Sequence, residues 1–197
     1  MDAPDEVREA VPPYDSYEVR LTYDDYCRAP EGLRYELVEG DLRMVPSPNV
    51  SHQRISGHLE KALRDRVDRH GLGEVLDAPL DVVLSQHNVV QPDILYVSRH
   101  RLGIITKANI WGPPDLVVEI LSPSTANWER TAKRAVYAKY GVQELWIVDP
   151  EARSIEVAAR QGGADLVTRQ VYPEGTTLES QVLPGFALAI DDVFRQV

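Results

Sequence analysis

The chain has 197 residues, of which 43% are hydrophobic, and this composition is typical of a globular domain and excludes a disordered chain. Its formal net charge of −10 disfavours general binding to phosphate backbones, because such binding depends mainly on Lys and Arg. Any nucleic-acid function must therefore rest on a local basic patch. The single cysteine, Cys27, excludes an internal disulfide and a cysteine zinc site.

The sequence contains no run of about 18 apolar residues, so we expect no transmembrane helix and no membrane partner. The N-terminus lacks the positive end and the apolar stretch of a signal peptide, and we therefore expect a cytoplasmic protein. Residues 1–19 are acidic and contain prolines, which predicts a flexible tail. Residues 20–197 are expected to form one domain.

The first elements of this domain are a short helix and a hairpin. Residues 21–29 predict the helix, with Thr22 as its N-cap and acidic residues in its first turn. Residues 35–46 predict a β-hairpin around Gly40 and Asp41.

A long helix is predicted next, over residues 47–71, and it ends at Gly71. Its apolar residues recur at helical spacing, namely Ile55, Leu59, Ala62, Leu63 and Val67. Residues 73–85 then predict either two short strands or one strand that bends at Pro79.

The second half of the chain predicts a βαβ unit. A strand at 91–98 precedes a nearly continuous apolar strand at 115–122, a helix at 127–141 and a strand at 144–150. This order implies a right-handed crossover with parallel pairing, and the apolar strand belongs in the centre of the sheet. Two further β segments are predicted at 154–160 and 164–172, and residues 183–197 follow them.

Glu119 stands inside the apolar strand. Side chains alternate along a strand, so Glu119 shares a face with Val117 and Leu121. A carboxylate there loses hydration unless a cation, a donor or a proton compensates. A salt bridge, or a strand end that reaches water, is the simplest explanation. A functional explanation is that Glu119, Asp93 from the nearby strand and Lys133 from the next helix form one site.

Two carboxylates and a lysine are suited to hydrolysis of a phosphodiester. Carboxylate oxygens bind Mg²⁺, which keeps several waters, polarises the phosphate and helps to generate hydroxide. The lysine would orient the water and stabilise the developing charge. A helical wheel sets Arg130, Lys133, Arg134 and Tyr137 on one arc and Ala132, Ala135, Val136 and Tyr140 on the arc expected to face the sheet. Lys133 lies at the border of the second arc, where its long side chain can reach the edge of the sheet. An ion pair between Glu129 and Lys133 is the competing explanation for the lysine.

Six segments in order resemble the Uma-two family of putative restriction endonucleases, within the PD-(D/E)XK nuclease superfamily. They are ELVEG, SHQRI, QPDILYVS, PDLVVEILSPST, the spaced Lys133 and Tyr137, and YGVQELWIVDP. The resemblance covers roughly residues 20–195. It implies an α/β (α+β) fold with a restriction-endonuclease-like core, in which helices flank a mixed central β-sheet.

The resemblance also implies roles for individual residues. Asp93 matches the aspartate of the PD motif and Glu119 the acidic residue of (D/E)XK, so both are expected to bind the metal and act in catalysis. The backbone carbonyl of Ile120 would be a further metal ligand. Lys133 would supply the lysine from the helix. Glu36 is expected to support the metal site.

This chain departs from the superfamily pattern at position 121, where Leu121 replaces the usual lysine. Gln91 is expected to line the site, and Tyr137 belongs to the same spaced motif as the lysine. His52 would contact the metal water or the substrate phosphate, with helix capping nearby as an equally weighted structural explanation. Glu129 stands where the family often has aspartate, and we assign it no catalytic role.

Arg130 and Arg134 form the predicted patch for phosphate or DNA, because they are the densest basic group near the proposed metal site. We therefore expect a Mg²⁺-dependent endonuclease that acts on DNA as a homodimer, with Mn²⁺ as a substitute for Mg²⁺. RNA or another phosphodiester is an alternative substrate for the same residues. A catalytically inactive nuclease-fold protein, working in binding or assembly, is the alternative function.

Overall fold

The computed structural model describes residues 19–30, 32–122, 128–163 and 165–197. The expected tail at residues 1–19 lies outside this part of the chain, except for Val19. In the described part, no helix is both long enough and apolar enough to cross a membrane.

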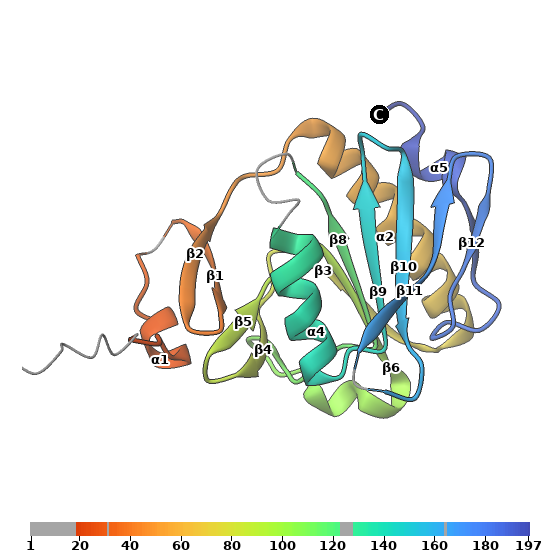
Figure 1. Ribbon diagram of the computed structural model, residues 1–197. Coiled ribbons are helices and arrows are strands. Elements are labelled where there is room, and N and C mark those ends of the chain that lie inside the picture. Colours follow the sequence, from red (N-terminus) through yellow and green to blue (C-terminus); the bar gives the residue numbers. More distant parts are fainter. Residues whose placement is uncertain (1–18, 31, 123–127, 164) are drawn as a thin grey trace, which may run out of the picture.

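A six-stranded mixed sheet forms the centre of the molecule, in the order β11-β10-β9-β8-β6-β3. β8 and β9 are parallel, as the βαβ pattern predicts, and the other neighbouring pairs are antiparallel. Helix α4 lies in front of this sheet in Figure 1 and α2 lies behind it. The strands are β3 (Gly73–Asp77), β6 (Ile94–Ser98), β8 (Leu116–Ile120), β9 (Glu144–Asp149), β10 (Ser154–Arg160) and β11 (Leu166–Pro173).

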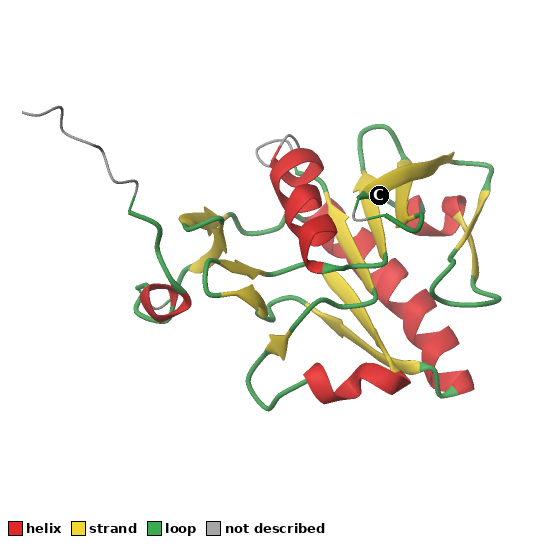
Figure 2. Ribbon diagram, turned by 60° about the horizontal axis from the view of Figure 1, so that its bottom comes forward, coloured by secondary structure: helices red, strands yellow, loops and turns green. Residues whose placement is uncertain are grey.

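A second sheet has the order β2-β1-β5-β4-β7. Figures 1 and 2 place its β1–β2 hairpin to the side of the six-stranded sheet, near the N-terminal helix α1. Its strands are β1 (Arg34–Val38), β2 (Asp41–Val45), β4 (Val82–Ser85), β5 (Asn88–Val90) and β7 (Ile110–Trp111). A separate pair consists of β12 (Thr177–Glu179) and β13 (Ala187–Ala189).

The helices differ in length and type. The long one, α2, begins after its N-cap Asn49 and ends at Gly71, whose left-handed backbone (φ 58°) suits glycine. The helical segments are α1 (Tyr23–Tyr26), α2 (Val50–His70), the 3₁₀ helix η1 (Arg99–Ile104), the π-helical turn η2 (Glu129–Lys133), α4 (Arg134–Tyr140) and α5 (Ile190–Phe194).

Two apolar cores, one on each face of the central sheet, hold these layers together. Leu116, Val118 and Ile120 of β8 pack in the core that contains the buried face of α2. Val117 packs in the core that contains α4. Burial of each such aliphatic side chain contributes about 1.5–3 kcal/mol. The alternation places Glu119 on the α4 side of the sheet.

Several predicted elements are confirmed with shifted bounds. Thr22 caps α1 and forms a capping box with Asp25. The hairpin turns at Glu39 and Gly40, one residue earlier than predicted, and both have positive φ (52° and 89°) as a two-residue hairpin turn requires. Segment 73–85 forms two strands, and they belong to different sheets.

The predicted faces of the helix at 127–141 are wrong in part. Tyr137 is buried, whereas Ala135, which was expected to face the sheet, is exposed. Both belong to the regular helix α4, whose buried face consists of Val136, Tyr137 and Ala138. Lys133, at the end of the π-helical turn that precedes α4, is buried as its place at the border of the sheet-facing arc allows. Residue 127, the predicted start of the helix, lies outside the described part of the chain.

Candidate active site

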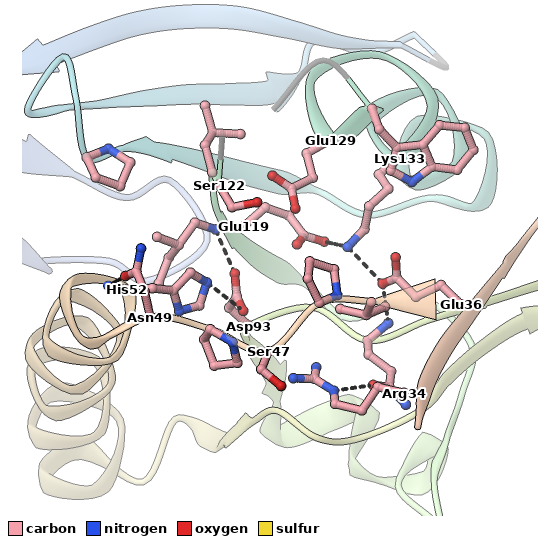
Figure 3. A pocket seen from close by; sticks show the side chains of 18 of the residues that line it. Arg34, Glu36, Ser47, Asn49, His52, Asp93, Glu119, Ser122, Glu129 and Lys133 are labelled. Atoms are coloured by element: carbon pink, nitrogen blue, oxygen red, sulfur yellow. Dashed lines mark hydrogen bonds and ion pairs between the residues drawn. The ribbon is translucent and has the colours of Figure 1, made fainter. Parts of the chain in front are cut away.

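A cavity of about 1070 Å³ opens where the hairpin, the N-terminal end of α2, the end of β8 and the η2 turn meet. Figure 3 shows its lining, with Lys133 between Glu119 and Glu36 on one side and His52 beside Asp93 on the other. The residues that line it and were predicted as site residues are Glu36, His52, Gln91, Asp93, Glu119, Ile120, Arg130 and Lys133.

Glu119 is only 2% exposed, so the desolvation that its place in the strand implies is real. Lys133 Nζ lies 2.6 Å from Glu119 Oε1, and the Tyr137 hydroxyl donates a hydrogen bond to the same oxygen. Burial raises the pKa of Glu119, and Lys133 opposes that rise. Both of these contacts involve Oε1.

Lys133 connects two acidic residues from different sheets. Its Nζ lies 2.9 Å from Glu36 Oε1 of the hairpin as well as near Glu119 of β8. Burial alone would lower the pKa of Lys133, but the two glutamates outweigh burial and raise it, so the ammonium stays charged. The ammonium therefore joins the hairpin to β8 at the wall of the cavity.

Asp93 lies just before β6, at the end of β8. The antiparallel register pairs Ile94 with Val118, which brings Asp93 near Glu119, and both line the cavity. The Ile120 N–H donates to Asp93 Oδ2 at 2.7 Å, which fixes the carboxylate at the end of β8.

His52 takes part in the helix capping that the sequence offered as its structural explanation, and its ring contacts Asp93, while a contact with the metal water or the phosphate stays a prediction. Its backbone N–H donates to the capping side chain of Asn49 at 2.8 Å, so it lies in the first turn of α2. Its Nε2 lies 3.3 Å from Asp93 Oδ1. Burial lowers the pKa of His52, but the hydrogen bond to Asp93 and its charge reverse the effect and raise that pKa. The Nδ1 atom is buried and has no hydrogen-bond partner.

Gln91 connects the site to the hairpin and to α1. Its backbone N–H donates to Glu36 Oε1 at 2.8 Å, and its side-chain oxygen accepts from Arg34 Nε at 3.0 Å. Its side-chain nitrogen donates to Asp81 Oδ1 at 2.8 Å. Gln91 thus positions neighbouring side chains in the cavity wall.

The donor set suits a hard cation that takes few protein ligands. Within the described ranges, no group of three or more His, Cys, Asp or Glu side chains is arranged to hold a metal. Mg²⁺ is commonly bound through one or two carboxylates, with waters and substrate phosphate completing its shell. Asp93 and Glu119 provide such a pair, so the residues fit Mg²⁺ and do not fit a closed site built from protein ligands alone.

The predicted basic patch is largely neutralised within the protein. Arg130 lines the cavity, but its guanidinium pairs with Asp149 at 2.7 Å and with Glu156 at 3.3 Å. Arg134 does not line the cavity and pairs with Glu156 at 2.7 Å. The sequence could not show this, because the two acidic partners lie on β9 and β10, far along the chain.

Other cavity residues were missed. Arg34 and Arg43 line the cavity, and the guanidinium of Arg43 lies over the Trp128 ring, 3.7 Å from its centroid. Trp128 packs partly on the α4-side core and also lines the cavity. The period of two along β1 places Arg34 on the face of Glu36, and this signal could have identified it.

The comparisons with known proteins agree with this architecture. The family model described as Uma2, "Putative restriction endonuclease", matches residues 21–191. A solved structure of a putative nuclease belonging to DUF820, from Anabaena variabilis ATCC 29413, is similar in fold, with a TM-score of 0.74 and 23% identity. The match covers 88% of this chain and 97% of that one. The search of curated proteins found no match. The family match spans most of the chain, which therefore belongs to the Uma2 family of putative restriction endonucleases.

Proposed function

We propose that the protein is a metal-dependent nuclease that hydrolyses phosphodiester bonds, with DNA as its substrate and Mg²⁺ as its cofactor. The observation that carries this proposal is that Asp93 and Glu119 line one large cavity, with Lys133 2.6 Å from Glu119. Family membership supports it independently.

Each side chain has a distinct part in the proposed reaction. Asp93 and Glu119 would hold Mg²⁺, which supplies charge for the phosphate and favours hydroxide near neutral pH. Lys133, at the wall of the cavity, would stabilise the charge that develops on the phosphate oxygen or on the attacking water. Glu36 and Tyr137 keep Lys133 and Glu119 in place. The Ile120 carbonyl as a third ligand stays a prediction.

The test is cleavage of plasmid and short duplex DNA with Mg²⁺, Mn²⁺ or EDTA. Asp93→Asn and Glu119→Gln preserve shape and are expected to lower the rate by at least about a hundredfold, as loss of a main electrostatic group does. Glu179→Gln is the control, because this exposed residue lies on β12. Full activity in both site variants would refute the assignment, and RNA in the same assay identifies the alternative substrate.

One observation favours the alternative, a nuclease fold used only for binding. Glu36, Glu119, Lys133 and Tyr137 already satisfy one another through short contacts. A site that has lost its catalytic activity would be stabilised by such a network without any metal. This alternative predicts that the purified protein binds no divalent cation and cuts no phosphodiester. Homodimer formation, which would present one site to each DNA strand, is a separate prediction for sedimentation velocity.

A further inference from the structure

We propose that the face of the β1–β2 hairpin that lines the cavity binds the phosphate backbone next to the scissile bond, through Arg34 and Arg43. This inference rests on the proposed function, because it names the surface by which that site takes a nucleic acid. It replaces the patch of Arg130 and Arg134 as the point of substrate contact.

The Lys and Arg side chains of the cavity differ in whether they already have acidic partners. Four Lys or Arg side chains line the cavity, and two of them, Lys133 and Arg130, form ion pairs with carboxylates. Arg34 and Arg43 form no ion pair with any residue that the structure describes. Their charge is therefore available to a phosphate, whereas phosphate binding at Arg130 would have to displace Asp149 and Glu156.

The register of the hairpin brings Arg34 and Arg43 to the same face, toward the cavity. Glu36 pairs with Arg43 and Arg34 pairs with Val45, so all four side chains lie on one face. All four also line the cavity. The two arginines are diagonal neighbours, with Cα atoms about 7–8 Å apart. They can therefore contact separate phosphate groups, and this suits a chain of phosphodiesters better than a single phosphate.

The contacts of Arg34 and Arg43 hold their guanidinium groups in place and orient the N–H donors. The Arg43 guanidinium lies over the Trp128 ring, and a guanidinium held on an aromatic face still presents its in-plane N–H groups to a ligand. Arg34 donates from Nε to Gln91, and its terminal nitrogens bond no other residue that the structure describes. Planar guanidinium groups held in this way bind phosphate oxygens in pairs.

The opposite wall of the cavity also favours a negatively charged ligand. The first turn of α2 contains no acidic residue, and its residues Asn49, Ser51 and His52 line the cavity. The partial positive charge at the start of a helix favours phosphate. A backbone lying between this turn and the hairpin would pass beside Asp93 and Glu119.

The experiment measures binding of a short fluorescein-labelled DNA duplex by anisotropy in Ca²⁺, over a series of salt concentrations. Arg34→Gln and Arg43→Gln should each weaken binding on the order of tenfold, as loss of a charge-assisted hydrogen bond does. Each should also reduce the slope of log affinity against log salt by about 1. Arg43→Lys should keep the slope but lose affinity, because lysine cannot replace the planar donors.

Two controls remove the same charge elsewhere, and cleavage by the same proteins is recorded in Mg²⁺. Arg134→Gln, and Arg69→Gln near the far end of α2, should leave affinity and slope unchanged. If the wild type cuts DNA but Arg134→Gln weakens binding and the two hairpin variants do not, this inference falls and the proposed function stands. A wild type that neither binds nor cuts nucleic acid overturns both.

Discussion

Glu119 can remain in a buried strand because Lys133 and Tyr137 replace the interactions with water that it loses. Lys133 is itself only 3% exposed, and it meets Glu119 and Glu36 at 2.6 and 2.9 Å. Two carboxylates share one ammonium, so the group carries excess negative charge. Such a group is suited to accept a cation, and the loss of Lys133 would destabilise the folded protein.

Replacing Lys133 tests this balance directly. Lys133→Met fills a similar volume but leaves two buried carboxylates without a cation, and we expect a loss of about 3–5 kcal/mol in the free energy of unfolding. Urea denaturation measures the loss. Adding Glu119→Gln to this variant should recover part of it, because one unpaired charge is then removed.

The control is Lys139→Met, which breaks an exposed pair with Glu39 and should cause no measurable change. A Lys133→Met protein as stable as the wild type would show that the carboxylates are protonated or hydrated without the lysine. The structural explanation of the buried glutamate would then be incorrect.

At the scale of elements, the short helix α1 fixes the hairpin on the second sheet. The Tyr26 hydroxyl donates to Asp81 Oδ1 at 2.7 Å, and Gln91, which contacts Arg34, donates to the same Asp81 oxygen. Burial raises the pKa of Tyr26, and its hydrogen bond to Asp81 adds to the rise. The tyrosine therefore links α1 to the wall of the cavity.

Tyr26→Phe should lower the free energy of unfolding by about 1 kcal/mol at neutral pH. Because the folded protein holds this proton more tightly than the unfolded chain, the contribution is present below pH 10.0 and decreases as the pH rises above it. The difference between the variant and the wild type should therefore shrink at alkaline pH. Urea unfolding across that range measures it, and a difference that grows with pH would contradict the assignment.

The sequence predicts elements well where periodicity is long. The spacing from Ile55 to Val67 predicts α2, and the apolar run at 116–120 predicts the central strand. Strands of two or three residues, β5, β7 and β12, have no periodic signal and were not predicted. The wheel at 127–141 failed for Tyr137 because this side chain is buried through a tertiary contact, the hydrogen bond of its hydroxyl to Glu119, which no local pattern shows.

The site divides in the same way. Asp93, Glu119 and Lys133 could be predicted because a charge in an apolar strand is a local anomaly and because they match a known family pattern. The contact of His52 with Asp93 and the stacking of Arg43 on Trp128 join segments distant in sequence, so no local pattern reveals them. The ion pairs that neutralise Arg130 and Arg134 were hidden for the same reason.

At the scale of the whole molecule, negative charge decides whether the cation or the nucleic acid binds first. The chain has a formal net charge of −10, and six carboxylate side chains but only four Lys or Arg side chains line the described cavity. A polyanion entering this cavity would be repelled until a cation reduces the negative charge. We therefore expect the divalent cation to bind before the nucleic acid.

Divalent cations should accordingly stabilise the folded protein in the absence of DNA. A ligand that binds only the folded state, at about 100 times its Kd, adds about 2.7 kcal/mol, so the Tm should rise with Mg²⁺ or Mn²⁺. Differential scanning calorimetry measures this, with NaCl at equal ionic strength as the reference. Glu119→Gln and Asp93→Asn should abolish the rise, while Glu179→Gln should retain it. An equal rise in all four proteins would mean that cations only screen the acidic surface, and a pair of carboxylates that binds no metal would favour the protein that binds nucleic acid without cutting it.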